Sequence, residues 1–360
     1  MKMIAFMKYG EKAASTRQRL LQFVPELEAA GIKVEWFPLL GDGQINQTGR
    51  LRNTAPIMAA YLRRVLALLR AQQYDLVWIH KELFPYTPGW FEGLIGRMGI
   101  PVVYDFDDAI FHNYDLSRRP LVRQLLGRRF EPLLRRVSAV SCGNAYLWDY
   151  AARFCPNSVV IPTVVDTDGY RPRSPAPDAG PPVIGWIGSH STWSYVEPLV
   201  PMLEALVVEG RARVRIVGSG VAAADLPAFE MIDWTEATEI AEVQAMDIGI
   251  MPLTDDPWSR GKCGYKLIQY MACGLPVVAS PVGVNVDLAQ PGVNGMLAET
   301  VEEWRGALVS LLEDETLRAA YGRAGRERVE RDFSLKAHAP RFIALLQSAV
   351  ADKQDGQPRP

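Results

Sequence analysis

A glycine-containing loop in the second half of the chain carries two lysines four residues apart. Residues 258–283 read WSRGKCGYKLIQYMACGLPVVASPVG and predict a loop, a helix over 265–272 and then a buried strand. Lys262 lies in the loop and Lys266 at the start of the helix. A helix N-terminus offers free N–H groups and a positive dipole end, to which two ammonium groups would add. We therefore expect Lys262, Gly264 and Lys266 to bind a diphosphate, the alternative being a solvated lysine pair.

Two other polar side chains stand close to expected turns. Gln269 follows Lys266 by one helical turn, so its amide shares that helix face and could meet a hydroxyl pair such as a ribose. His190 follows the run IGWIGS, in which Gly188 and Ser189 form a second glycine loop. A side chain at this position can reach a phosphate or a sugar, and a structural role is equally open.

The first expected strand is followed by KYGEKAASTRQRL, with Gly10 in the turn and Arg17 and Arg19 at the start of a helix. Basic residues at a helix N-terminus are unfavourable for the dipole unless an anion is bound there. We expect Gly10, Arg17 and Arg19 to lie at an anion, with a solvated helix face as the alternative.

Carboxylates gather at the end of a further strand, in the run VVYDFDDAIFH. Asp105, Asp107 and Asp108 fall within four residues, and His112 follows them. Carboxylates packed together repel one another and shift each other's pKa, which favours a functional role. A metal-binding pair of carboxylates is one alternative, and a helix N-cap is another for Asp108. A lone histidine such as His112 is more often a loop residue than a catalyst.

Short apolar runs alternate with helical patterns and place these residues at strand ends. The expected strands are 3–7, 34–38, 75–80, 101–104, 139–142, 159–161, 183–187, 214–217, 247–251 and 276–279. Strands separated by helices imply βαβ units and parallel sheets, so the predicted fold class is α/β with two Rossmann-like, doubly wound domains facing a cleft. Such domains bind ligands at the carboxyl ends of their strands.

A proline-rich stretch marks the predicted domain boundary. Residues 171–182, RPRSPAPDAGPP, hold five prolines and suit an extended linker. The expected domains are 1–170 and 183–335. A helix over 340–350, with Pro340 in its first turn, is expected to pack back on the first domain, and the polar tail 351–360 is expected to be disordered.

The overall composition is that of an ordinary globular chain, with 48% apolar residues and a net charge of −2 over 360 residues. This balance argues against a nucleic-acid-binding surface. The charge is uneven, because residues 1–175 hold 23 basic and 16 acidic residues. We expect no signal segment and no membrane-spanning run, hence a cytoplasmic chain, and free thiols at all four cysteines.

Several runs together resemble a known family, the GT-B glycosyltransferases of family 4, which retain anomeric configuration. These runs are GLPVVAS with its preceding QYMACG helix, IGWIGS, IVGSG, MDIGIMPL and the turn VNG. The resemblance implies a nucleotide-diphosphate sugar donor bound by Gly188, Ser189, His190, Lys262, Gly264, Lys266 and Gln269. It also implies transfer to a hydroxyl of a carbohydrate or lipid-linked acceptor in cell-envelope synthesis, with no metal and no cofactor.

The family's pair of glutamates eight residues apart is missing from this chain. Its second member, which holds the ribose, falls on Gln269, and its first, which touches the donor sugar, falls on Gly261. Asp255 or Asp256 is a substitute for the first. This departure keeps two alternatives open: a sugar-nucleotide epimerase, and a catalytically weak nucleotide-sugar-binding protein.

In the first half the resemblance is weaker. It implies that Gly10, Arg17 and Arg19 lie near the donor phosphates or the acceptor, and that Asp105, Asp107 and His112 act at the reacting sugar and acceptor hydroxyl.

Two stretches of the first half are strongly basic. Residues 117–137 carry seven arginines and one glutamate on an amphipathic helical pattern that Pro132 should kink. Residues 43–74 contain no acid and add Arg50, Arg52 and further arginines. Such helices dock on anionic membranes, although arginines that merely face water are the plainer interpretation. We expect a peripheral position on the inner face of the cytoplasmic membrane.

Overall fold

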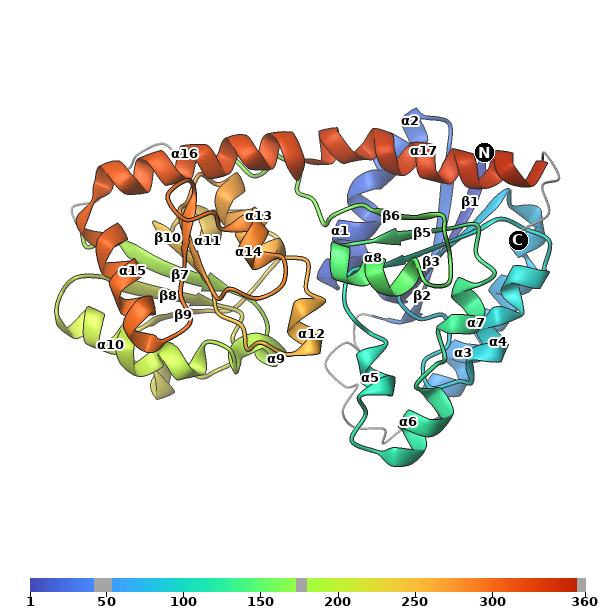
Figure 1. Cartoon of the computed structure of the whole chain (residues 1–360), viewed down its shortest axis with the longest axis horizontal. Helices are drawn as coiled ribbons and strands as arrows, with labels where there is room; N and C mark the ends of the chain where they lie inside the picture. The colour runs from blue at the N-terminus through green and yellow to red at the C-terminus, as the bar shows by residue number, and fades with distance from the viewer. Residues whose placement is uncertain (42–53, 173–179, 355–360) are drawn as a thin grey trace. The chain divides into compact units, whose positions relative to one another are not determined.

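The computed structural model describes residues 1–41, 54–172 and 180–354, and its contacts divide the chain into two units (Figure 1). Unit 1 comprises Met1–Thr163 together with Gly261–Cys263 and His338–Pro360, and unit 2 comprises Val164–Arg260 and Gly264–Ala337. The division after Thr163 falls before the proline-rich stretch, of which residues 173–179 lie outside the described residues.

Unit 1 is built on a parallel sheet in the order β2-β1-β3-β4-β5-β6. The strands are β1 (Lys2–Tyr9), β2 (Lys33–Leu40), β3 (Leu76–His80), β4 (Val102–Phe106), β5 (Ala139–Cys142) and β6 (Ser158–Val160). The register pairs His80 with Asp105, so the polar ends of β3 and β4 lie side by side.

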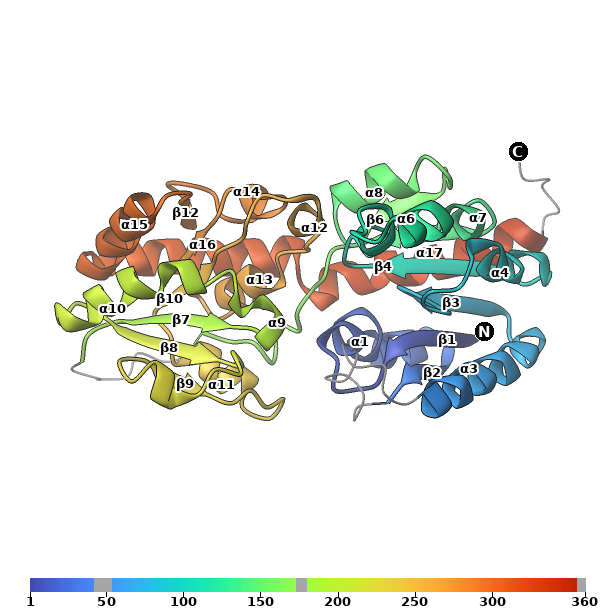
Figure 2. The ribbon, with the colours of Figure 1, turned by 90° about the horizontal axis from the view of Figure 1, so that it is seen from below.

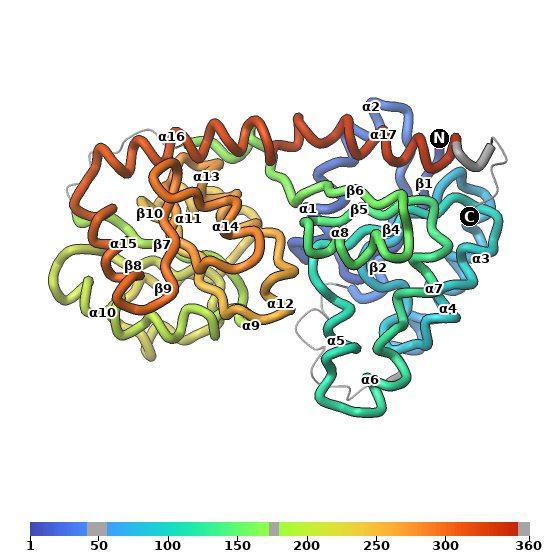
Figure 3. The backbone as a smooth tube through the Cα atoms, viewed as in Figure 1, coloured from blue at the N-terminus to red at the C-terminus, as the bar shows by residue number. Residues whose placement is uncertain are grey.

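Helices cover both faces of this sheet. They are α1 (Ala14–Arg19), α2 (Val24–Ala29), α3 (Thr54–Leu69), α4 (Gly89–Gly93), α5 (His112–Asp115), α6 (Pro120–Leu126), α7 (Glu131–Leu134), α8 (Ala145–Ala151) and most of α17 (Leu335–Gln354). Phe342 of α17 packs on Trp78 of β3, while Tyr104 of β4 packs toward Phe130, just before α7. Figures 1 and 3 show α17 along one side of the sheet and α3, α4 and α7 on the other.

Unit 2 contains the second parallel sheet, in the order β12-β11-β10-β7-β8-β9. Its strands are β7 (Val183–Ile187), β8 (Arg213–Val217), β9 (Glu230–Ile232), β10 (Ile248–Met251), β11 (Val277–Ala279) and β12 (Gly295–Leu297). Its helices are α9 (His190–Trp193), α10 (Val200–Val208), α11 (Glu239–Gln244), α12 (Pro257–Arg260), α13 (Tyr265–Ala272), α14 (Asn285–Leu288), α15 (Val301–Glu313) and α16 (Glu315–Asp332).

The sheet of unit 2 separates two apolar cores. Trp186 and Leu308 belong to the core that also takes in α10 and α15, and Leu267 and Val329 to the one formed by α13 and α16. The predicted α/β class with two parallel, doubly wound sheets is therefore confirmed. The strands β9 and β12, the two edge strands of this sheet, were not predicted.

The helical stretch after the first strand is divided before Pro25, as a proline inside a helical pattern predicts, and Pro25 lies in the first turn of α2, where proline is tolerated. Two other local predictions were inaccurate. Residues 117–137 form α6 and α7 instead of one kinked helix, and the break precedes Pro132. The helix α17 begins at Leu335, so Pro340 lies inside it, and the helix runs to Gln354, into the tail expected to be disordered. Residues 355–360 of that tail and Arg50 and Arg52 lie outside the described residues.

All four cysteines are free, as predicted. Three are buried, and only Cys263 is half-buried.

Candidate functional site

Each sheet has one point at which the strand order reverses, and parallel sheets bind ligands outside the carboxyl ends of the strands there. In unit 1 this point lies between β1 and β3, and in unit 2 between β7 and β10. Gly10 follows β1, His80 ends β3 and Gly188 follows β7. Gly10 and Gly188, two of the predicted site residues, therefore lie at the carboxyl ends of strands that border these points.

In unit 1, Asp105 and Arg19 are bound to each other inside the protein. Arg19 Nε donates to Asp105 Oδ2 at 3.0 Å and Nη2 donates to Oδ1. The same guanidinium donates to the Ile161 carbonyl at 2.8 Å and to Ser141 Oγ at 3.0 Å. Burial opposes the charge of Arg19, but the Asp105 carboxylate outweighs it and raises the pKa of Arg19. This pair fixes α1 to β4, and Arg19 is occupied by a protein carboxylate where the sequence suggested an anion.

Asp107, two residues later, is contacted by His80 at the end of the neighbouring strand β3 and by Lys81 directly after it. Lys81 Nζ lies 2.9 Å from Asp107 Oδ1 and 2.6 Å from Asp108 Oδ2, and His80 Nε2 lies 3.3 Å from Asp107 Oδ1. Burial alone would raise the pKa of Asp107, but Lys81 and then His80 hold it well below the ordinary value. Asp107 is thus an ionised carboxylate at the sheet edge.

Lys81 was not predicted as a site residue. Its backbone has φ of 61°, in the left-handed region that a side chain other than glycine rarely adopts. Lys81 N donates to the Asp105 carbonyl at 2.8 Å, and Tyr104 Oη donates to the Lys81 carbonyl. These bonds hold the strained residue in place, a pattern typical of functional sites. The basic residue directly after the strand-ending His80 was the available signal.

The ammonium of Lys81 lies where a metal would have to bind between Asp107 and Asp108. Within the described ranges, the structure contains no group of three or more His, Cys, Asp or Glu residues arranged to hold a metal.

His112 begins α5 and is bound at both ring nitrogens. Its Nδ1 lies 2.8 Å from Asp115 Oδ1, and its Nε2 lies 2.8 Å from the hydroxyl of Tyr146 on α8. No bond joins it to Asp105 or Asp107 among the contacts of the described residues. Its predicted catalytic role stays a prediction, and the hydroxyl of Tyr146 is the outer end of this Asp–His–Tyr chain.

The turn after β1 is closed by Arg17. Its Nη1 donates to the carbonyl of Lys12 at 2.8 Å and weakly to that of Glu11 at 3.4 Å, while Gly10 is buried in the same turn. The predicted contact between Arg17 and an anion stays a prediction.

The predicted lysine loop is shared between the units, because Gly261–Cys263 belongs to unit 1 and Gly264 begins the next part of unit 2. Asn144 Nδ2 donates to the carbonyls of Gly261 at 2.9 Å and Lys262 at 3.0 Å. A Cβ at Gly261 would lie 2.4 Å from the Cβ of Ala109 and 2.9 Å from its nitrogen. A glutamate therefore does not fit at this position, which explains why the chain departs from the family pattern there.

In unit 2, two glycines bring the ends of β7 and β8 together. A Cβ at Gly188 would lie 2.3 Å from the ring of Trp186, and one at Gly218, where φ is 76°, would lie 2.5 Å from the Gly188 carbonyl. Only bare backbone fits here. Beside it, Ser189 caps α9 in a capping box with Thr192, and His190 Nδ1 lies 3.2 Å from the Ser219 carbonyl.

Lys266 lies over the ring of Trp186. Its Nζ is 5.7 Å from the centroid of the Trp186 ring, the same ring that abuts Gly188. Gly264 caps α13 with φ of 66°, and a Cβ there would lie 2.2 Å from Leu288. The structure therefore brings together Gly188 and Lys266, through Trp186, at the start of a buried helix.

Gln269 is buried, and its side chain reaches a carboxylate that the sequence did not indicate. Its Nε2 donates to Tyr170 Oη at 2.8 Å and to Glu239 Oε1 at 3.0 Å. Trp234 Nε1 donates to Glu239 Oε2 at 2.7 Å. Both N–H groups of the amide are thus used within the protein, so a ribose hydroxyl would have to donate to Gln269 Oε1 or to Glu239.

The two aspartates suggested as substitutes for the missing glutamate have local partners. Asp255 pairs with Arg260 at 2.7 Å, and Asp256 accepts from the Ser259 nitrogen at 2.8 Å, which caps α12. They close the loop before α13, and nothing in these bonds gives them a substrate role.

Comparison with known families matches most of the chain. The family described as Glycosyltransferase Family 4 matches residues 17–168, and the one described as Glycosyl transferases group 1 matches residues 181–314.

Among curated proteins, D-inositol 3-phosphate glycosyltransferase of Segniliparus rotundus is 25% identical over 72% of this chain and 65% of its own length. The GDP-mannose-dependent monoacylated alpha-(1-6)-phosphatidylinositol monomannoside mannosyltransferase of Corynebacterium glutamicum is 34% identical over 24% of this chain and 23% of its own length. The chain thus spans less than two thirds of the curated relatives that it matches.

Solved structures share the whole architecture at low identity. Sucrose-phosphate synthase from Thermosynechococcus elongatus has a TM-score of 0.75 and 17% identity, with 98% of this chain and 100% of that chain covered. Anabaena HepE in complex with UDP and glucose has a TM-score of 0.69 and 16% identity, with 97% and 100% covered. With its two parallel sheets and its matches in both halves, the chain belongs to the group 1, family 4 glycosyltransferases and has the GT-B fold.

Proposed function

We propose that the protein is a retaining glycosyltransferase that moves a sugar from a nucleoside diphosphate to an acceptor hydroxyl. The observation that carries this proposal is the close approach of the Gly188 and Gly218 backbones at the carboxyl ends of β7 and β8, with Lys266 over the Trp186 ring that abuts Gly188. Strand β7 borders the point of unit 2 where the strand order reverses. Retention is proposed from family membership.

The donor diphosphate would lie against the glycine pair. Bare backbone lets a phosphate approach closely, and the N–H groups at the start of α13 point outward from a helix end capped by Gly264. The Lys266 ammonium supplies positive charge where the leaving diphosphate gains negative charge. An interaction that strengthens as the bond breaks lowers the barrier more than it tightens ground-state binding. Ser189, His190 and Lys262 stay proposed donor contacts.

The ribose would be held by Gln269 together with Glu239. Their 3.0 Å contact explains the glutamine, because a glutamate at 269 would put two carboxylates against each other. The carboxylate that the family supplies from position 269 is supplied here from the first turn of α11, where Tyr170 and Trp234 orient it.

Asp107 would act on the acceptor side. It is ionised, it is anchored by Lys81 and His80, and it lies at the sheet edge next to the buried Asp105. An anchored carboxylate can accept a hydrogen bond from an acceptor or sugar hydroxyl and keep that hydroxyl in a fixed orientation. We propose that the reaction requires no metal, since Lys81 already neutralises Asp107 and Asp108.

For the acceptor, we propose a carbohydrate or lipid-linked molecule of the cell envelope at the inner face of the cytoplasmic membrane. The Corynebacterium relative, whose name includes a phosphatidylinositol acceptor, supports a lipid-linked class. No helix among the described residues combines the length and the apolar character needed to cross a bilayer.

Thermal unfolding in the presence of UDP, GDP and ADP and their sugars tests the donor proposal. A nucleotide that binds only the folded chain should raise Tm as its concentration rises. The sugar nucleotide that gives the largest shift is then incubated with and without lipid and saccharide acceptors. New glycoside in the presence of acceptor supports transfer. An altered sugar nucleotide formed without acceptor would indicate an epimerase, and binding without turnover over the whole panel would indicate a binding protein.

A further inference from the structure

Helix α3 exposes a stripe of large apolar residues and buries one of its two arginines. Met58, Leu62, Leu66 and Leu69 follow one face at spacings of four, four and three, and they are 51% to 70% exposed. Arg64 instead points inward: it is 2% exposed, and its Nη2 donates to the carbonyls of Met7 and Phe37 at 2.6 and 3.1 Å. A surface helix normally buries its leucines and exposes its arginines. The outward leucines of α3 therefore need an explanation outside the fold of unit 1.

The apolar surface continues onto neighbouring elements. Ring contacts of 5.5 Å between Tyr61 and Phe84 and of 5.0 Å between Phe84 and Phe91 join α3 to α4. A third ring contact, at 5.5 Å, joins Tyr86 to Tyr114 of α5, the helix packed against α6. The large exposed apolar residues of these segments are together called the apolar face. They are Met58, Leu62, Leu66, Leu69, Tyr86, Trp90, Leu94, Leu116, Leu121 and Leu125.

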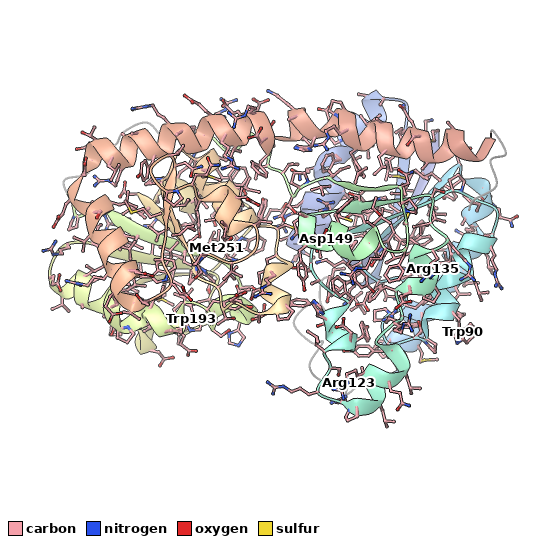
Figure 4. The ribbon with its side chains drawn as sticks, in the orientation of Figure 1. Trp90, Arg123, Arg135, Asp149, Trp193 and Met251 are labelled. Atoms are coloured by element: carbon pink, nitrogen blue, oxygen red, sulfur yellow. The ribbon has the colours of Figure 1, made fainter. Side chains whose placement is uncertain are left out.

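Figure 2 shows α3 along one edge of unit 1, α6 toward the opposite edge and α4 at one end. In Figure 1 α3, α4 and α6 lie on the lower side of unit 1, the side turned to the viewer in Figure 2. Figure 4 shows Trp90 projecting outward from α4 and Arg123 from α6. Soluble surfaces carry single exposed leucines, but a gathered set with tryptophan and tyrosine marks an interaction surface.

The charges around the apolar face are positive. Its exposed arginines have no acidic partner among the described residues: Arg63, Arg70, Arg97, Arg118, Arg119 and Arg123. The acids of the same segments are neutralised. Arg129 lies 2.8 Å from Glu82 and 2.6 Å from Glu92 inside unit 1, and Asp115 and Glu131 are bound by His112 and Arg128.

This combination selects one kind of partner. A second copy of the chain would set arginines against arginines across a two-fold interface, which costs free energy. An anionic lipid surface satisfies both features, because its headgroups attract arginines while leucine, tryptophan and tyrosine side chains enter the boundary between headgroups and acyl chains. We propose that the apolar face of unit 1 docks the protein on an anionic membrane leaflet, with the leucine stripe of α3 as its inserted ridge.

Residues 117–137 and 43–74 were the basic stretches expected to meet a membrane, and the structure leaves only part of the first of them outward. Arg129 of that stretch is buried in ion pairs, and Leu126, Phe130, Leu133 and Leu134 belong to the core. What remains outward from it is Leu121 and Leu125 with nearby arginines, and α3 contributes the longer apolar stripe.

Flotation or co-sedimentation of the full chain with vesicles tests this proposal without any sugar donor, so its outcome is separate from that of the proposed activity. Vesicles of phosphatidylcholine alone are compared with vesicles containing about 30 mol% phosphatidylglycerol. We expect binding to the anionic vesicles only, and weaker binding as the salt concentration rises from about 50 to about 500 mM. A chain that binds neither the phosphatidylcholine vesicles nor the anionic vesicles would overturn the proposal.

Matched variants identify the surface. The double substitution Leu62→Ser/Leu66→Ser should lower vesicle partitioning about tenfold, and Arg63→Glu/Arg70→Glu by a similar factor. Val208→Ser, at an 85% exposed position of unit 2, should leave binding unchanged. Thermal unfolding checks that each variant is folded. Unchanged binding in both double variants would overturn the assignment to α3. A dimer in sedimentation velocity that Leu62→Ser/Leu66→Ser dissociates would show instead that the face joins two copies.

Discussion

The carboxyl ends of the two sheets differ in chemistry, although both sheets are parallel and six-stranded. In unit 1 the edge is filled with buried charges that neutralise one another, Arg19 with Asp105 and Lys81 with Asp107. In unit 2 the edge is made of the bare backbones of Gly188 and Gly218, with Lys266 over the Trp186 ring that abuts Gly188. The first edge fixes side chains in place, while the second leaves backbone for a ligand to approach.

The outer surfaces differ as well. The large apolar side chains exposed in the described part of unit 2 are all valines: Val208, Val286, Val293 and Val301. In unit 1 they are leucines, a methionine, tryptophans and a tyrosine, which offer far more apolar area. Under the proposed function, this difference would assign the donor to unit 2 and the acceptor to unit 1.

The largest effect should come from breaking the charge cluster of unit 1. Replacing Lys81 by Met leaves Asp107 and Asp108 without their ammonium partner at a buried edge, which should cost about 3–5 kcal/mol of unfolding free energy. Urea unfolding measures this loss. Lys336→Met is the matched control, because Lys336 pairs with Asp168 at the exposed surface and its loss should barely change the urea midpoint. Equal midpoints for the two variants would show that the cluster of unit 1 is not a stabilising feature.

The next effect concerns the edge of unit 2. Lys266→Ala should lower kcat about 100-fold, equivalent to about 2.7 kcal/mol, with a much smaller change in nucleotide Kd, because the ammonium acts mainly on charge that develops as the donor bond breaks. Steady-state kinetics and calorimetry with the donor found by thermal shift separate the two quantities. Lys336→Ala should have unchanged kinetics. An active Lys266→Ala enzyme would refute the proposed diphosphate site.

Acid unfolding gives a smaller and independent measure of the cluster in unit 1. The pKa of Asp107 is lowered in the folded chain, so its contribution to stability is fully present above the unfolded carboxyl pKa of about 3.9 and is lost as pH falls toward the folded value. Below about pH 4, this one group should cost about 1.4 kcal/mol of stability per pH unit. Asp107→Asn should remove that share of the acid slope while leaving the slope above pH 5 unchanged. An identical acid limb in both proteins would mean that Asp107 is not held ionised by Lys81.

The sequence predicted the strand bounds well, because the apolar runs reflect both the local preference for strand conformation and the burial of the side chains. Val183–Ile187 and Ala139–Cys142 were predicted with the observed bounds. It could not predict that Arg19 would meet Asp105, since the two lie 86 residues apart and their contact depends on how α1 packs against β4. For the same reason the sequence suggested an anion for Arg19.

Residues 117–137 show the limit of periodicity most clearly. Their helical spacing was real, but the arginines were assumed to be equivalent, and one of them, Arg129, is fully buried between Glu82 and Glu92. Its two carboxylate partners come from the loop after β3 and from α4, so their distance in the sequence hid the ion pairs. Glu239 was missed in the same way, because it reaches Gln269 from a helix 30 residues earlier.

The smallest predicted effect tests how unit 2 replaces the missing family glutamate. Gln269→Glu places a second carboxylate next to that of Glu239, whereas Glu239→Gln leaves two amides and no carboxylate. Each single variant should weaken nucleotide binding about fivefold, or about 1 kcal/mol. The double variant Gln269→Glu/Glu239→Gln returns one carboxylate and one amide to the site and should recover most of the affinity. Glu236→Gln, in the turn just before α11, is the matched control and should bind normally. Calorimetry with the preferred nucleoside diphosphate measures all four variants. Additive losses in the double variant would show that the two side chains do not share one ribose, whereas recovery would place the carboxylate of this donor site on α11.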